Sequence, residues 1–314
     1  MTAPLFKPRA LRLGATLAVL SPASTPKPEL VERGMAHLQR LGYKTVLSPH
    51  ALDSGPLYYA GKLEDRLRDL HAAFADPKID GIVCTRGGWG SAELLPHLDA
   101  KLIRSNPKPF IGYSDHTSLH CWLHNEANLA TFYGPMVAAD FSRGDGADLA
   151  SWQHSLTDDG VWSLGEAEGL RVLRAGQAEG LVAGGCLSIF AEALGTPYAP
   201  RIERDSILFL EDIGTKPYQW DRMLLHLRYA GVLEKVTGIV FGDMGQNVAS
   251  EEADYLERAI LHALREFDGP IAVGLRCGHV STYNVTLPLG VAARLDLSDA
   301  RNPWMHLLEA AVSG

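Results

Sequence analysis

The sequence predicts a two-domain α/β protein, in which a domain built on a parallel sheet precedes a smaller α+β domain. At 314 residues the chain is long for one compact core. In its first half, short apolar runs alternate with amphipathic segments, as strands and crossover helices of a parallel sheet do. Around 144–176 the pattern loosens into Gly, Asp and Ser. We therefore expect domains at 1–148 and 175–314, joined by a crossing at 149–174.

The first domain is expected to contain five strands and three intervening helices. Its strand candidates are short apolar runs, whereas its helix candidates carry apolar residues at helical spacing. The strands are expected at 17–20, 45–47, 81–84, 110–111 and 130–133, and the helices at 29–41, 63–74 and 117–125. In such a sheet the functional groups gather at the carboxyl ends of the strands.

The second domain opens at the glycine-containing stretch 180–185. Strands are expected at 207–210, 238–241 and 271–273, and helices at 187–194 and 220–230. The sequence contains no internal repeat and no low-complexity tract.

Composition excludes several classes of protein. A net charge of −8 argues against a nucleic-acid binder, which needs a basic face to neutralise phosphates. The four cysteines are scattered without a C-x-x-C pair, so we expect reduced, buried thiols rather than a zinc ribbon or a disulfide scaffold. Residues 1–14 lack a signal-peptide core, and no apolar stretch approaches the roughly 18 residues of a membrane span. We expect a cytoplasmic protein with no membrane partner.

A candidate nucleophile, Ser114, follows the apolar run 109–111. A strand that stops abruptly and turns into a helix lifts its turn residue out of the sheet, and the helix N-terminus offers N–H groups to a developing oxyanion. A Ser-Asp pair before an amphipathic run is also an ordinary helix cap. This segment alone supports both interpretations equally.

A serine nucleophile needs a base and an acceptor that orients the base. The strand at 207–210 runs into Glu211 and Asp212, and the strand at 271–273 is followed by Gly278 and His279. These positions could bring a carboxylate and an imidazole to one sheet edge. A solvated acidic turn and a surface histidine are the alternatives.

The glycine-rich loop 85–91 follows another strand end, where its backbone N–H groups can approach a ligand closely. It could donate half of an oxyanion hole. A phosphate-binding loop is the rival, but both the Walker lysine and the G-x-G-x-x-G pattern are missing. Arg86 could hold a substrate carboxylate in a bidentate fork or form a structural ion pair.

His116, His120 and His124 recur every four residues, which places them on one helical face as metal ligands sometimes are. No glutamate lies between them to act as a base. We therefore expect one histidine near the active-site cleft and two packing histidines, with no metal site.

Nine short motifs occur in an order typical of one enzyme family. They are Leu13-Gly14 to Ser21-Pro22, Asp76-Pro77-x-x-Asp80-Gly81-Ile82, Arg86-Gly87-Gly88-Trp89-Gly90, Gly112-Tyr113-Ser114-Asp115, Gly184-Gly185-x-Leu187-Ser188, Leu194-Gly195-Thr196-Pro197-Tyr198, Leu210-Glu211-Asp212, Gly278-His279 and Leu287-Pro288-Leu289-Gly290. Over nearly its whole length the chain resembles the LD-carboxypeptidase family, serine peptidases that include muramoyltetrapeptide carboxypeptidases and the microcin C self-immunity proteins.

The resemblance implies a Rossmann-like first domain and an active site at the domain interface. It implies a triad of Ser114 as nucleophile, His279 as general base and Glu211 as the acceptor that fixes the histidine tautomer. The N–H groups of Gly88 and Asp115 would form the oxyanion hole. The implied reaction removes D-alanine from a murein tetrapeptide through an acyl-enzyme during cell-wall recycling, without a cofactor, in a homodimer.

The chain departs from the family at Cys186, where many members carry an asparagine whose amide can contact substrate; a thiol is only a weak donor. Substrate choice is therefore less determined than chemistry, and a microcin C-type peptide-nucleotide is the alternative substrate. A non-catalytic peptide-binding protein and a metallohydrolase built on the three histidines are the rival classes.

Overall fold

A computed structural model describes residues 5–157 and 160–314, and its contacts divide the chain into two units. The first unit comprises Met1–Gly160, Tyr283–Pro288 and Ala310–Gly314, and the second comprises Val161–Thr282 and Leu289–Glu309. Positions 158 and 159, within the expected crossing, and positions 1–4 of the N-terminal segment lie outside the described residues. The mixed α/β architecture expected from the sequence is confirmed.

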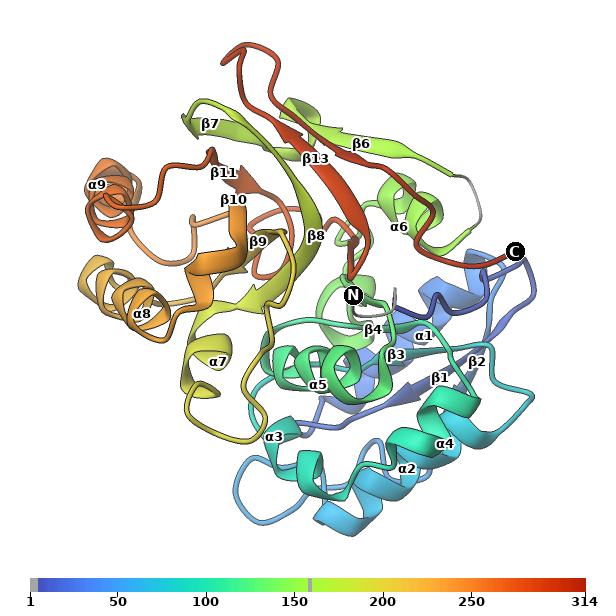
Figure 1. Cartoon of the computed structure of the whole chain (residues 1–314). Coiled ribbons are helices and arrows are strands. Elements are labelled where there is room, and N and C mark those ends of the chain that lie inside the picture. The colour runs from blue at the N-terminus through green and yellow to red at the C-terminus, as the bar shows by residue number, and fades with distance from the viewer. Residues whose placement is uncertain (1–4, 158–159) are drawn as a thin grey trace. The chain divides into compact units, whose positions relative to one another are not determined.

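The first unit is built on a six-stranded sheet (Figure 1). In spatial order its strands are β12 (Leu287–Leu289), β5 (Thr131–Tyr133), β4 (Phe110–Gly112), β3 (Gly81–Cys84), β1 (Thr16–Leu20) and β2 (Lys44–Leu47). The pairings from β5 through β2 are all parallel. The carboxyl ends of β3 and β4 therefore meet at one edge of this sheet.

Helices also belong to this unit. They are α1 (Pro28–Arg40), α2 (Leu63–Ala75), α3 (Ser91–Leu94), α4 (Ala100–Ser105), α5 (Thr117–Trp122) and α6 (Leu149–Leu156). Those from α1 to α5 lie between successive parallel strands along the chain. In α1, Pro28 and Glu29 suit the first turn and Arg40 suits the last, while Val31 and Leu38 are buried. Figure 1 shows α2 and α4 packed side by side.

The second unit contains an eight-stranded mixed sheet. In spatial order its strands are β6 (Trp162–Gly165), β14 (Trp304–Leu307), β13 (Ala292–Asp296), β8 (Gln177–Cys186), β9 (Ser206–Glu211), β10 (Val236–Gly242), β11 (Ile271–Leu275) and β7 (Arg171–Arg174). The four strands from β8 to β11 are parallel, and antiparallel strands flank them on both sides. Every residue of β9 is buried, as expected of a central parallel strand.

Among the described residues of this second unit, the α-helices are α7 (Leu187–Glu192), α8 (Pro217–Tyr229) and α9 (Ala253–Ala263). Helices α8 and α9 lie side by side (Figure 1). None of the helices in the described part of the chain combines the length and apolar character needed to cross a membrane.

The stretch expected to be an irregular crossing, 149–174, is largely regular: it holds α6, β6 and β7. Its strands are half-exposed edge strands, so they lack the continuous apolar run that reveals a buried strand. Two short segments expected in the second domain, Tyr283–Pro288 and Ala310–Gly314, belong to the first unit instead. Strand β12 explains why the chain returns to the first unit at Tyr283–Pro288, because this strand adds to the edge of the first sheet beside β5.

Candidate active site

Ser114 occupies a sharp turn directly after β4. Its φ is +65°, in the left-handed region that non-glycine residues seldom adopt. The neighbouring strand β5 braces this turn, because the Ser114 N–H donates to the Tyr133 hydroxyl at 3.0 Å. Such local strain is typical of a nucleophile presented at a strand-to-helix turn. An ordinary helix cap would have extended backbone instead.

The glycine turn after β3 lies directly against this serine. A Cβ placed on Gly87 would lie 2.7 Å from Ser114 Cβ and 2.9 Å from its Oγ. Gly88 has φ +109°, and a Cβ there would lie 2.3 Å from Ser24 Oγ, which bonds the backbone of Trp89. Only glycine allows this close approach. The first unit thus places the glycine turn directly against Ser114 and the Asp115 backbone N–H.

Arg86 opens the same turn and is exposed to solvent. Among the described residues it forms no ion pair, so the structural ion pair considered for it is absent there. Its guanidinium is therefore available to an anionic group.

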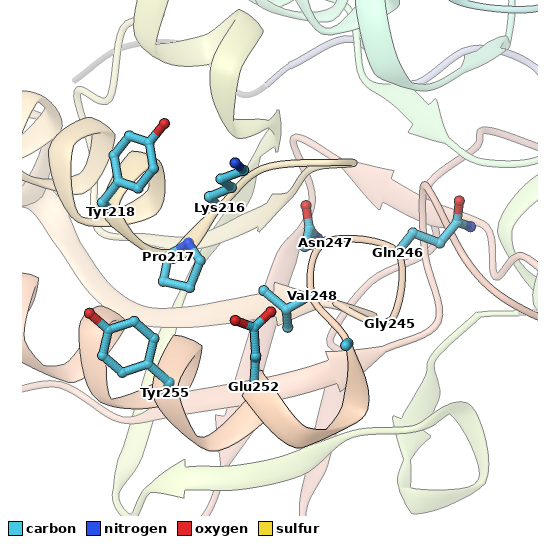
Figure 2. Close-up of a pocket in the computed structure, with 10 residues that line it drawn as sticks. Lys216, Pro217, Tyr218, Gly245, Gln246, Asn247, Val248, Glu252 and Tyr255 are labelled. Atoms are coloured by element: carbon cyan, nitrogen blue, oxygen red, sulfur yellow. The ribbon is translucent and has the colours of Figure 1, made fainter.

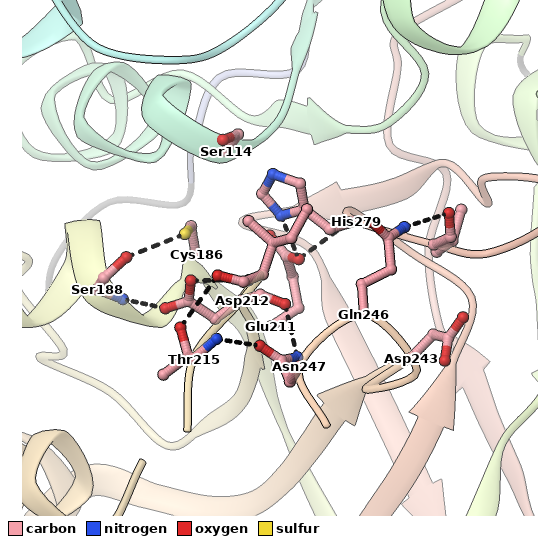
Figure 3. Close-up of polar contacts among 12 residues, drawn as sticks. Ser114, Cys186, Ser188, Glu211, Asp212, Thr215, Asp243, Gln246, Asn247 and His279 are labelled. Atoms are coloured by element: carbon pink, nitrogen blue, oxygen red, sulfur yellow. Dashed lines mark hydrogen bonds and ion pairs between the residues drawn. The ribbon is translucent and has the colours of Figure 1, made fainter. Parts of the chain in front are cut away.

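The second unit brings Glu211 and His279 together (Figure 3). Glu211 ends β9 with a fully buried side chain, and its Oε2 accepts from both the His279 ring Nδ1, at 2.8 Å, and the His279 backbone N–H, at 2.9 Å. A carboxylate acceptor at Nδ1 selects the tautomer whose Nε2 carries the lone pair. The His279 side chain is 14% exposed, which leaves its edge accessible. This arrangement suits a general base.

Two glycines make room for this pair. A Cβ on Gly278, where φ is +91°, would lie 2.5 Å from Glu211 Cδ, and a Cβ on Gly242 would lie 2.6 Å from Glu211 Cβ. Because neither glycine has a side chain, the backbone at both positions can lie directly against the Glu211 side chain.

Cys186 lies beside Glu211, because the two residues are register partners of β8 and β9. Its Sγ is 3.5 Å from Ser188 Oγ, and burial, together with the nearby carboxylates of Glu211 and Asp212, raises the pKa of the thiol well above its ordinary value. Cys186 is therefore a neutral thiol. All four cysteines are buried and none is joined in a disulfide, as expected.

A polar loop, residues 243–249, was missed by sequence reasoning and supports both members of the pair (Figure 3). Asn247 donates from Nδ2 to the Asp212 carbonyl at 2.8 Å, and its Oδ1 accepts from the Thr215 N–H at 2.9 Å. Gln246 donates from Nε2 to the Val280 carbonyl at 2.7 Å. The loop thus holds the residues that follow Glu211 and His279. The polar run after the strand at 238–241 was its only sequence signal.

The other side of this loop lines a cavity of about 530 Å³ in the second unit (Figure 2). Lys216 and Tyr218, at the start of α8, and Glu252 and Tyr255, at the start of α9, complete its wall. Gln246 and Asn247 therefore contribute both to this cavity and to the support of the catalytic candidates.

The three histidines at four-residue spacing each have protein partners. His120 bonds Thr131 Oγ1 at 2.8 Å and the Gly112 carbonyl at 2.9 Å, and His124 bonds Thr131 at 3.0 Å. Burial lowers the pKa of His120 to about 4. These two histidines tie α5 and its continuation to β4 and β5, as packing residues do.

One group among the described residues could approach metal-ligand spacing: His50, Asp53 and Asp65, whose ligand atoms lie within 4.8 Å of one another. The Arg68 guanidinium already contacts Asp65 Oδ1 at 2.6 Å and His50 Nε2 at 3.3 Å. The Arg68 guanidinium thus already occupies ligand atoms of this group, and we assign no metal to it.

Two domain models and a known protein are similar in sequence to this chain. Residues 17–134 match the model of the LD-carboxypeptidase N-terminal domain, and residues 179–295 match that of its C-terminal domain. A probable murein peptide carboxypeptidase of Bacillus subtilis is 35% identical over 98% of this chain and 96% of its own.

Two solved structures resemble the whole chain. The microcin self-immunity protein MccF in complex with glutamyl sulfamoyl guanosine matches with a TM-score of 0.89 and 26% identity, covering 99% of this chain and 100% of its own. A muramoyltetrapeptide carboxypeptidase from Oxalobacter formigenes matches with a TM-score of 0.81 and 29% identity, covering 94% and 99%.

Proposed function

The chain belongs to the LD-carboxypeptidase family, and on this premise we propose that it is a serine carboxypeptidase removing the C-terminal D-alanine from a murein tetrapeptide. The observation that carries the proposal is the bond from His279 Nδ1 to the buried Glu211. It prepares Nε2 to accept a proton, which is what a serine nucleophile requires of its base.

In the proposed reaction, Ser114 Oγ attacks the carbonyl carbon of the terminal peptide bond while its proton passes to His279 Nε2. The protonated imidazole then donates to the leaving nitrogen, so that D-alanine departs as the free amine and an acyl-Ser114 ester remains. Water activated by His279 hydrolyses this ester and regenerates Ser114. Glu211 keeps its negative charge throughout and stabilises the imidazolium.

Two further roles belong to the first unit. The N–H groups of Gly88 and Asp115 would stabilise the oxyanion, supported by the closeness of the glycine turn to Ser114. Arg86, exposed and without an ion-pair partner among the described residues, would bind the substrate's terminal carboxylate. Cys186 would contact substrate as a neutral thiol.

Ser114 belongs to one unit and Glu211 with His279 to the other, so the proposed triad takes its residues from both units. We also propose that the protein acts in the cytoplasm, in cell-wall recycling, and that it forms a homodimer. Light scattering, which measures the mass of the particle in solution, tests the homodimer.

The test is Ser114→Ala with murein tetrapeptide, with released D-alanine identified by mass. We expect kcat to fall by at least about 10⁴-fold, as when a triad serine is removed, while calorimetry shows peptide binding retained. Ser142→Ala, a half-buried serine that bonds the backbone of Ala138, is the matched control and should keep wild-type turnover. Near wild-type release of D-alanine by Ser114→Ala would contradict the mechanism.

A second candidate substrate is an acyl-sulfamoyl nucleotide of the microcin C type. The similarity to MccF, whose complex contains glutamyl sulfamoyl guanosine, favours it. Incubating the protein separately with murein tetrapeptide and with such an adduct, followed by mass analysis, distinguishes the two.

A further inference from the structure

His116 bonds both ends of the glycine turn, whereas the other two histidines of its row bond only the strands of the sheet. Its Nε2 lies 3.0 Å from the Arg86 carbonyl oxygen, and its Nδ1 lies 3.0 Å from Ser91 Oγ. Between these two contacts the chain carries Gly87 and Gly88. Any change in the His116 contacts would therefore act on the turn beside Ser114.

Chemistry assigns the protons in this arrangement. A carbonyl oxygen only accepts, so Nε2 must carry the hydrogen that is donated to Arg86. Nδ1 then accepts from the Ser91 hydroxyl, and one neutral tautomer satisfies both contacts. The side chain of His116 is fully buried, and burial, with His120 nearby, lowers its pKa to about 3. His116 thus stays neutral at any working pH.

Asp115, the other residue directly after the nucleophile, strengthens the same connection. Its Oδ2 accepts from the Ser91 N–H at 2.8 Å, and its side chain is buried. The two residues that follow Ser114 therefore hold the first and last residues of the turn 86–91 through their side chains. The segment that follows the nucleophile and the turn are thus bonded directly to each other.

We propose that His116 is a positioning residue of the oxyanion hole, which fixes the turn 86–91 so that the Gly88 N–H faces the oxyanion formed when Ser114 attacks. The inference rests on the proposed function. His116 touches neither substrate nor the reacting atoms, and acts through the Arg86 carbonyl and the Ser91 hydroxyl. This role also explains why one member of the histidine row differs from the other two.

Loss of the Nε2 bond should lower kcat with little effect on KM, because an oxyanion donor acts in the transition state. Removing a whole donor costs roughly 10²–10³-fold in kcat, so a displaced donor should cost about 10–100-fold. Ground-state binding of the peptide does not use this donor.

Two substitutions separate the hydrogen bond from the shape of the side chain. His116→Gln places an amide N–H near the position of Nε2 and should keep kcat within about threefold of wild type, because donation to Arg86 survives. His116→Asn is too short to reach Arg86 and should show the 10–100-fold loss. His124→Gln, on the same helical face but bonded to Thr131, is the matched control and should leave kcat unchanged.

A wild-type kcat for His116→Asn would overturn the proposal, and so would equal losses for the asparagine and glutamine variants. A measurement on the unmodified chain keeps the test decisive even if a variant fails to fold. In protein labelled with ¹⁵N-histidine, NMR should show His116 as the Nε2–H tautomer, and the Nδ1–H tautomer would refute the inference.

The outcomes also distinguish this inference from the proposed function. If Ser114→Ala kept turnover, the proposed function would fail, whatever the tautomer of His116. If Ser114→Ala lost turnover while His116→Asn matched wild type, only the positioning role would fail. Amide exchange at Gly87 and Gly88 should accelerate in His116→Asn and not in His124→Gln, which reports the turn without any substrate.

Discussion

At the scale of single residues, the candidate site depends on backbone conformations that cost free energy. Ser114 adopts a left-handed φ that its side chain disfavours, and Gly278 adopts one that only glycine accepts readily. Ser114 is the proposed nucleophile, and Gly278 precedes the proposed base. The strain at Ser114 indicates that the surrounding contacts, rather than local preference, determine where this group lies.

Gly278→Ala should reduce catalytic activity by more than its loss of folding stability accounts for. The new Cβ would meet Glu211 Cδ at 2.5 Å and push the carboxylate away from His279. We expect kcat to fall at least about tenfold, since a displacement of about 1 Å at a catalytic group costs about that or more.

Gly195→Ala is the matched control for this substitution. It has φ +83°, close to the +91° of Gly278, but nothing lies within 4 Å of a Cβ there. Urea unfolding should show a backbone cost of about 1 kcal/mol in Gly195→Ala and a larger loss of stability in Gly278→Ala, where the clash with Glu211 adds to that cost. Full activity in both variants would show that Glu211 does not need the space that Gly278 leaves.

At the scale of elements, the loop 243–249 connects two strand ends that are separated in sequence. Asp243 adds to the bonds of Gln246 and Asn247, because its Oδ2 accepts from the Ser281 N–H at 3.1 Å. The ends of β9 and β11 are thus held by one segment. Alignment of Glu211 with His279 is in this sense a property of the loop.

Asn247→Ala should therefore lower kcat about tenfold while KM changes less, because two bonds to the segment after Glu211 are lost and the pair is held less firmly. We expect about 1–3 kcal/mol less stability towards urea, since a buried carbonyl and N–H lose their partner. Tyr255→Phe, in the wall of the same cavity, should keep both quantities. An unchanged kcat in Asn247→Ala would separate the loop from catalysis.

Sequence reasoning found the strand ends and missed what holds them. The run 207–210 ending on Glu211 is readable, because a buried parallel strand is continuously apolar and a carboxylate after it stands out. The bonds of Asn247 and Gln246 join residues more than 30 positions apart, and no local pattern encodes such pairing. The edge strands in 149–174 were not predicted for a related reason, since a half-exposed strand has the mixed polarity of a loop.

The sequence predicted that Glu211 and His279 follow strand ends, but it did not predict the contact between them. The sequence shows a carboxylate and an imidazole after two strands, but the register of β9 against β10 and of β10 against β11 decides whether they meet. His116 is a clearer example, because its spacing with His120 and His124 indicates one helical face but does not show that, of the three, His116 bonds the glycine turn.

At the scale of the whole molecule, buried neutral histidines make stability depend on pH. Burial lowers the pKa of His116 to about 3 and that of His120 to about 4, below their ordinary value of 6.5. Below pH 6.5 the unfolded chain binds protons at these positions and the folded chain does not. Acid therefore favours the unfolded state. Asp140, whose pKa burial raises to about 6, opposes this between its ordinary value of 3.8 and 6.

We expect the free energy of unfolding to fall as the pH is lowered from 6.5 towards 4, by up to about 1.4 kcal/mol per pH unit for each histidine. Urea titrations at pH 7, 6 and 5 measure it. His116→Gln should remove its share of the slope. A slope that is the same in this variant would mean that His116 is protonated in the folded chain.

The route of the chain limits how this protein can be divided. The polypeptide leaves the first unit at Gly160, returns for Tyr283–Pro288, leaves again, and ends in the first unit at Ala310–Gly314. A fragment ending at Gly160 would lack β12 and expose the edge of β5, and an exposed strand edge promotes aggregation. Neither half is thus a contiguous module for recombination or separate expression, and a chain split at Gly160 would have to receive the missing strand in trans.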